Sequence, residues 1–132
     1  ELISRSKHSQ NISLTPFISS KELIKKYSST NLFILPSKSE GLGRVIIEAQ
    51  STACPVLVSS NTGMTDLVIE NETGYIFENN NKKDLKEKMQ YIIKNYDNAV
   101  QVGLNSRDFV KDNQSIKNFE FGYKKLFDLV CT

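Results

Sequence analysis

Short apolar runs that alternate with stretches of helical pattern constrain the fold of this chain more than any other feature. Residues 32–35, 55–59 and 74–77 form such runs, and a shorter one at residues 12–15 is stopped by Pro16. Continuous apolar runs of this length are typical of strands that are buried on both faces of a parallel sheet. About four strands, with helices between them and short links, predict an α/β fold with a parallel sheet and flanking helices.

Helical patterns fill the segments between these runs. We expect helices at residues 20–28, 42–52 and 64–69 and, from residue 82 onward, a helical C-terminal tail with breaks near residues 95–97 and 112–114. Ser19 or Ser20 is the expected N-cap of the first helix, and Glu22 in its first turn favours the same start. After residue 82, apolar residues fall on one stripe of a helix, namely Leu85, Met89, Ile92 and Ile93.

A sheet of about four strands is smaller than a complete nucleotide-binding unit, which has about six. We therefore expect residues 1–132 to form a single domain that is truncated at its N-terminal side. Residues 1–7 would then be the end of a helix whose preceding strand is missing.

The composition excludes several classes of protein. Of the 132 residues, 39% are apolar and 24% are charged, as in soluble globular domains, and the net charge is +2. Lysines and acids alternate, so the basic stripe of a nucleic-acid binder is absent, and no apolar run approaches the length of a membrane span. Cys54 and Cys131 lie outside any metal-ligand spacing, and His8 is expected to be a solvated residue. No signal peptide is visible, so we expect a cytoplasmic protein.

The candidate site is the polar segment between the second predicted strand and the helix at residues 42–52. Ligands of open α/β sheets bind beyond the carboxyl ends of the strands, and a helix start offers free N–H groups to an anion. Gly41 and Gly43 let the backbone approach a phosphate without interference from a Cβ atom. Because the same glycine spacing occurs in ordinary flexible turns, this pair leaves both interpretations open.

Glu48 is a carboxylate within the apolar run at residues 45–49. Carboxylates are rarely buried without a partner. One interpretation pairs Glu48 with Arg44 across one helical turn, an interaction worth only about 0.2–0.5 kcal/mol. The other has Glu48 accept hydrogen bonds from a ribose diol, as an acidic residue does in other nucleotide-binding folds. Glu40 would then face whatever extends beyond the phosphates.

The segment around these two glutamates resembles the motif of a known family. The segment from Glu40 to Glu48 resembles the E-x7-E motif of retaining group 1 glycosyltransferases. The segments at residues 22–37, 55–63 and 72–77 are similar to that family's flanking motifs and occur in the same order. The resemblance therefore covers nearly the whole chain. It implies the C-terminal, donor-binding, Rossmann-like domain of a GT-B enzyme.

The resemblance also implies roles for individual residues. Glu48 would hold the ribose hydroxyls, and Glu40 would act catalytically by holding a hydroxyl of the donor sugar. The backbone N–H groups of Leu42, Gly43 and Arg44, next to Gly41, would meet the diphosphate or the sugar. Such enzymes transfer a hexose with retention and need neither metal nor cofactor. The donor, a UDP- or GDP-sugar, is a substrate, and lipopolysaccharide or capsule synthesis is the expected setting.

Two parts of such an enzyme are absent from this sequence. The basic pair that neutralises the diphosphate precedes the region where the sequence starts, and so does the N-terminal domain that binds the acceptor. We therefore expect the chain alone to be inactive. Any peripheral contact with a membrane would go through the missing domain.

The sequence departs from the family's pattern at a few positions. Ala53 occupies a position after the helix where the family prefers glycine, which predicts some backbone strain. Thr62 replaces a usual glycine, and Asp66 replaces a usual glutamate.

Three alternatives remain. One is a non-catalytic binding or interaction domain with the same fold, and another is a sugar phosphorylase of GT-B architecture. The third, half of a Rossmann dehydrogenase, needs a third glycine where Ile46 stands.

Overall fold

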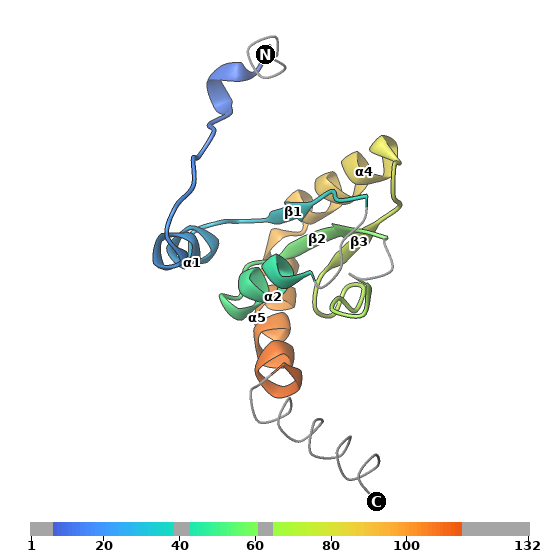
Figure 1. Cartoon of the computed structure of the whole chain (residues 1–132). Helices are drawn as coiled ribbons and strands as arrows, with labels where there is room; N and C mark the ends of the chain where they lie inside the picture. Colours follow the sequence, from blue (N-terminus) through green and yellow to red (C-terminus); the bar gives the residue numbers. More distant parts are fainter. Residues whose placement is uncertain (1–6, 39–42, 61–64, 115–132) are drawn as a thin grey trace, which may run out of the picture.

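The computed structural model describes residues 7–38, 43–60 and 65–114. Within them, three strands form a parallel sheet in the order β1 (Phe33–Leu35), β2 (Val56–Ser59) and β3 (Tyr75–Phe77). The strands lie side by side in the order of the sequence, with helices above and below them (Figure 1). The predicted α/β fold with a parallel sheet is confirmed.

The helices follow the predicted pattern closely. They are the short 3-10 helix η1 (Ser9–Asn11), then α1 (Ser20–Ser28), α2 (Arg44–Ser51), α4 (Lys82–Lys94) and α5 (Tyr96–Asn113). The predicted break near residues 95–97 is the single residue Asn95 between α4 and α5. Residues 1–6, residue 64 of the predicted short helix and residues 115–132 of the predicted C-terminal tail lie outside the described residues. Residues 66–69 of that predicted short helix are not helical: they form a turn followed by irregular backbone.

The predicted strand at residues 12–15 is wrong. This segment has no regular secondary structure, and its apolar side chains are exposed: Leu14 is 80% exposed, and Phe17, just beyond it, is 99% exposed. A strand needs a neighbour to bond with, and no described strand pairs with this segment. Figure 1 shows it leading away from the sheet, between η1 and α1.

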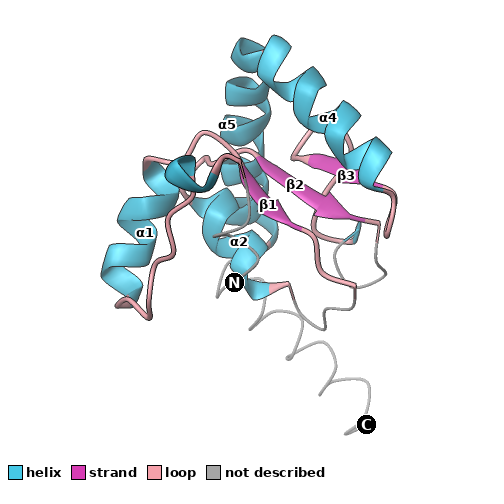
Figure 2. Cartoon of the chain, turned by 90° about the horizontal axis from the view of Figure 1, so that it is seen from above, coloured by secondary structure: helices cyan, strands magenta, loops and turns pink. Residues whose placement is uncertain are grey.

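The sheet is packed on both faces, most completely at β2, whose four residues are all buried, and this explains its continuous apolar runs. Val56 and Val58 point to the side of α1 and α2, where they pack with Ile46 and Ala49. Leu57 points to the other side, into a cluster that includes residues of α4 and α5. Figure 2 shows α1 and α2 on one side of the sheet and α4 on the other.

The turn from α2 into β2 contains the strained residue that the sequence predicts. Ala53 has φ 60°, in the left-handed region that favours glycine. Its carbonyl lies against Gly103 of α5, where a Cβ atom would come within 2.3 Å of the Ala53 oxygen. The missing side chain of Gly103 therefore lets α5 pack closely against the end of α2.

Carboxylates cover the outer edge of β3. The Ile76 N–H donates to the carboxylate of Glu70, which also forms an ion pair with Lys88 of α4. One position beyond the strand, the Glu78 N–H donates to the carboxylate of Asp84 at 2.6 Å. Because these N–H groups already have acceptors, this edge does not offer them to a further strand.

Candidate functional site

The polar segment that follows β1 lies at the carboxyl ends of the strands, as predicted. A hydrogen bond from the fully buried Ser59 hydroxyl to the Ser37 carbonyl joins the ends of β2 and β1. The segment then continues to Gly43, where α2 begins. Since Glu40, Gly41 and Leu42 lie outside the described residues, their predicted roles stay predictions.

Gly43 is the N-cap of α2 and has left-handed backbone geometry, with φ 53° and ψ 30°. Only glycine adopts this region without steric cost. Its carbonyl accepts from the Ile46 N–H at 2.8 Å, and no side chain caps the first turn. The N–H groups at the start of α2 are therefore of the kind that anions bind at helix starts.

Glu48 lies one turn further along α2 than Arg44, on the same face of the helix. The Arg44 Nε and Glu48 Oε1 atoms are 3.7 Å apart, so the ion pair of the first interpretation is present. The Arg44 side chain is 88% exposed and that of Glu48 is 35% exposed. The expectation that Glu48 is buried is therefore wrong, because this face of α2 is left partly open by its neighbours. A half-exposed carboxylate in a weak pair remains accessible to a ligand.

Tyr27 of α1 is a second neighbour of Glu48. Burial is the main cause that raises the pKa of the Tyr27 hydroxyl, and the nearby negative charge of Glu48 raises it further. Tyr27 belongs to the core between α1, α2 and the sheet, and its ring meets Phe33 edge-on with centroids 5.4 Å apart. Glu48 thus lies where α2 meets α1, at the border of a packed core.

Gln50 was not among the predicted site residues. It connects α2 to the segment before β3 by hydrogen bonds. Its side chain is fully buried, and Nε2 donates to the carbonyls of Leu67 at 3.0 Å and Thr73 at 3.1 Å. Its Oε1 atom is buried without a hydrogen-bond partner among the described residues. The sequence shows a polar residue inside an apolar helical run, but it does not show with which backbone groups that residue forms hydrogen bonds.

A cavity of about 350 Å³ opens on the opposite side of the same loop. Its floor is apolar, with Pro36, Phe77 and Leu85, and its rim carries Lys38, Lys82 and the asparagines at residues 79–81. The sequence motifs did not predict this cavity. The available signal was the position of the three asparagines, directly after the third strand and before a helix.

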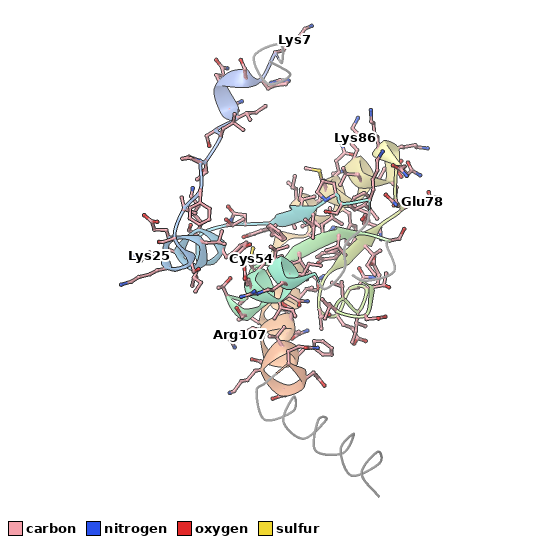
Figure 3. All side chains as sticks on the ribbon, viewed as in Figure 1. Lys7, Lys25, Cys54, Glu78, Lys86 and Arg107 are labelled. Atoms are coloured by element: carbon pink, nitrogen blue, oxygen red, sulfur yellow. The ribbon has the colours of Figure 1, made fainter. Side chains whose placement is uncertain are left out.

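Other candidate groups carry no chemistry in the structure. Cys54 is buried, and burial raises the pKa of its thiol to about 11, so the thiol stays protonated at neutral pH. His8 lies in the exposed N-terminal segment, away from the carboxyl ends of the strands (Figure 3 labels its neighbour Lys7).

Within residues 7–38, 43–60 and 65–114, no three metal-ligating side chains gather at one point. Over the same ranges no helix has the length and apolar character needed to cross a bilayer.

The sequence profile of the family described as "Glycosyl transferases group 1" matches residues 1–109. This chain belongs to that family. Among curated relatives, the capsular polysaccharide biosynthesis glycosyltransferase CapM of Staphylococcus aureus is 36% identical over 92 residues. That match covers 70% of this chain and 24% of CapM, so the chain spans about a quarter of the length of this relative.

Solved structures place the fold within GT-B glycosyltransferases. Sucrose-phosphate synthase from Thermosynechococcus elongatus superposes with a TM-score of 0.87 at 26% identity, over 97% of this chain and 33% of that protein. The C-terminal domain of the group 1 protein LpcC from Francisella tularensis has a TM-score of 0.71 at 20% identity, covering 78% of this chain and 53% of that domain. The chain thus has the fold of a GT-B C-terminal domain, and the dehydrogenase alternative is wrong.

A structure of Anabaena HepE in complex with UDP shares the same fold. Its TM-score is 0.68 at 18% identity, over 82% of this chain and 29% of HepE.

Proposed function

We propose that this chain is the nucleotide-sugar-binding half of a retaining glycosyltransferase. The observation that carries the proposal is the start of α2. The helix begins at the left-handed Gly43, immediately beyond the carboxyl end of the sheet, and presents a half-exposed Glu48 one turn later. Helix-start N–H groups beside an accessible carboxylate suit a ligand that joins a diphosphate to a ribose diol.

The proposed roles follow that chemistry. The backbone N–H groups of Leu42, Gly43 and Arg44, with Gly41 before them, would bind the diphosphate. Glu48 would accept hydrogen bonds from the ribose. Its ion pair with Arg44 is worth only about 0.2–0.5 kcal/mol, so a ribose hydroxyl can displace it at small cost. Glu40, eight positions before Glu48, would hold a hydroxyl of the transferred sugar, which is present in the donor but not in the free nucleotide.

A UDP-sugar is the donor that we favour. The support is the HepE complex with UDP, whose fold this chain shares. A GDP-sugar is the competing donor, and the two are separated by binding measurements. The name of CapM, a relative from capsule synthesis, supports a growing surface polysaccharide as the acceptor. We propose that a further domain, for which the greater length of the relatives leaves room, holds most of that acceptor.

The decisive test replaces each of the two glutamates by alanine and compares the effects. It uses a protein that contains this chain together with the further domain proposed above. Glu48→Ala should weaken the binding of both UDP and the UDP-sugar about tenfold to a hundredfold, since a hydrogen bond to a charged group is worth roughly 1.5–3 kcal/mol. Glu40→Ala should lower turnover and leave UDP binding nearly intact. Calorimetric titration and transfer assays measure the two effects.

Two controls make this result specific. Glu87 forms an i,i+4 ion pair with Lys83 on α4, as Glu48 does with Arg44 on α2. Glu87→Ala should change neither the UDP affinity nor the turnover. If Arg44→Ala weakened UDP as much as Glu48→Ala does, the pair would serve the helix rather than the ribose. A non-catalytic domain of the same fold would bind no nucleotide in any variant, and equal losses of UDP affinity on replacing either glutamate would refute the assigned roles.

A further inference from the structure

The carboxyl end of β2 carries two adjacent serines, and each forms a hydrogen bond to the loop of a different neighbouring strand. The Ser59 hydroxyl donates to the Ser37 carbonyl in the loop after β1. The Ser60 hydroxyl accepts from the Asn79 N–H in the loop after β3 at 3.0 Å. Because β2 is the middle strand of the three (Figure 1), its end is the point from which both loops can be held.

The Ser59 hydroxyl is buried in an otherwise apolar strand. All four residues of β2 are 0% exposed, and the three before Ser59 are Val56, Leu57 and Val58. A buried hydroxyl without a partner costs about 1–3 kcal/mol, a cost that an apolar side chain would avoid. The hydrogen bond to the Ser37 carbonyl offsets this cost. What a serine adds at this position is therefore a fixed place for that carbonyl.

This hydrogen bond holds one end of the loop that leads to the proposed donor site. β1 ends at Leu35, so Ser37 lies beyond the ladder that pairs β1 with β2. The other end of the loop is Gly43, the N-cap of α2, and α2 is held by side chains in the core between α1, α2 and the sheet. Only residues 38–42 lie between the two ends. A short segment fixed at both ends has less conformational freedom to lose when a ligand binds.

From these observations we propose that Ser59 is a positioning residue for the donor site. By holding the Ser37 carbonyl, it sets the path of the loop from β1 to the start of α2. The connection to the donor rests on the proposed function, in which the N–H groups at the start of α2 bind the diphosphate. Ser59 itself is buried and does not touch the nucleotide. Ser60 holds the loop after β3 and has no part in donor binding.

Alanine at each serine, in the isotope-labelled chain, tests these two roles by amide NMR and UDP titration. Without ligand, Ser59→Ala should shift the amide resonances of Ser37, Lys38 and Gly43. It should also weaken UDP binding about threefold to tenfold, in line with the net worth of one hydrogen bond, about 0.5–1.5 kcal/mol. Ser60→Ala is the neighbouring control. It should shift the Asn79 amide instead and leave the UDP affinity within about twofold.

Two further variants separate positioning from stability. Ser106→Ala removes another fully buried hydroxyl, which donates to the Gly103 carbonyl within α5 at 2.8 Å. It should lower the melting temperature, as Ser59→Ala does, and leave the UDP affinity within about twofold. Ser59→Thr keeps the hydroxyl and should keep the UDP affinity within about twofold, although an extra methyl group in a packed core lowers the melting temperature.

Three results would overturn the positioning role: an unshifted Gly43 amide in Ser59→Ala, an unchanged UDP affinity in that variant, or an equal loss of UDP affinity in Ser106→Ala. Titration of the unaltered chain with UDP keeps this proposal distinct from the proposed function. If the unaltered chain bound no UDP while Ser59→Ala still shifted the Gly43 amide, the donor site would fail and the hold of Ser59 on the loop would stand.

Discussion

At the scale of single residues, the backbone geometry at the two ends of α2 determines where the chain is strained and where a helix start can face a ligand. Gly43 and Ala53 flank α2, and both have positive φ, 53° and 60°. At Gly43 the glycine makes the geometry free of strain, and the helix start can face a ligand. At Ala53 a Cβ atom is retained in the same region, at a cost of about 1–2 kcal/mol. That this position strains a non-glycine residue was predicted from the family's preference for glycine there.

Ala53→Gly should stabilise the chain. It removes the left-handed strain of about 1–2 kcal/mol and adds about 0.4–1 kcal/mol of unfolded-state entropy, so the free energy of unfolding should rise by about 0.5–1 kcal/mol. Urea unfolding measures the change. Ser51→Gly is the comparison, because Ser51 has helical geometry and glycine there should destabilise by about 0.5–1 kcal/mol. The same sign for both substitutions would show that Ala53 is not strained.

At the scale of secondary-structure elements, local signals predicted what local interactions determine. The start of α1 was predicted from Ser19 or Ser20 as the N-cap and from Glu22 in the first turn, and in the structure Ser19 and Glu22 form a reciprocal capping box. The Ser19 hydroxyl accepts from the Glu22 N–H at 3.3 Å, and Glu22 accepts from the Ser19 N–H at 2.9 Å. The Ser19 hydroxyl also donates to the Glu22 carboxylate at 2.7 Å, and this hydrogen bond, together with the one from the Ser19 N–H, lowers the pKa of the Glu22 carboxyl.

Elements that depend on distant partners were predicted less well. Residues 12–15 have a strand-like pattern, but a strand forms only where a neighbour completes its hydrogen bonds. The helix pattern of α2 led to a buried Glu48, yet exposure depends on how α1 and α2 are packed. The cavity beside Lys82 was missed for the same reason, because its walls come from the loop after β1, from β3 and the loop that follows it, and from α4. The sequence spacing thus predicted a helix start beyond β1 with Glu48 on that helix, but not the surfaces that segments form together. The predicted role of Glu40 stays a prediction.

Ser19→Ala should destabilise α1 by about 1 kcal/mol, the usual cost of removing a helix N-cap. Hydrogen exchange of the α1 amides is the measurement, and their protection should fall about fivefold. Ser20→Ala, one position further in the first turn, should leave the protection nearly unchanged, because the cap is Ser19. If Ser20→Ala had the larger effect, the cap would be assigned to the wrong residue.

At the scale of the whole molecule, the proposed function makes the chain one side of a larger site. Its candidate donor contacts and its cavity both lie beyond the carboxyl ends of the strands, and the match with CapM covers only 24% of that relative. The outer edge of β3 is covered by Glu70 and Asp84, so extension of the sheet at that edge is blocked. Any partner that completes the site must approach elsewhere.

The chain by itself should not transfer sugar. Retaining transfer depends on holding the acceptor against the donor and on stabilising the departing diphosphate. The part of the chain that the structure describes offers helix-start N–H groups but no second wall that excludes water from the donor. Incubation with UDP- and GDP-sugars and a panel of sugar, lipid and peptide acceptors should give at most trace hydrolysis. Robust transfer by these 132 residues would require a different mechanism.

The central claim is that the start of α2 and Glu48 bind a nucleoside diphosphate, and thermal unfolding of the chain with UDP tests it most directly. A ligand that binds only the folded chain stabilises it by about 2.7 kcal/mol at 100 times its dissociation constant. We predict that millimolar UDP raises the melting temperature, that GDP raises it less, and that the Glu48→Ala variant loses most of the UDP effect while Glu87→Ala keeps it. If neither UDP nor GDP shifted the melting curve at millimolar concentration, or if Glu48→Ala responded like the unaltered chain, the claim would be contradicted.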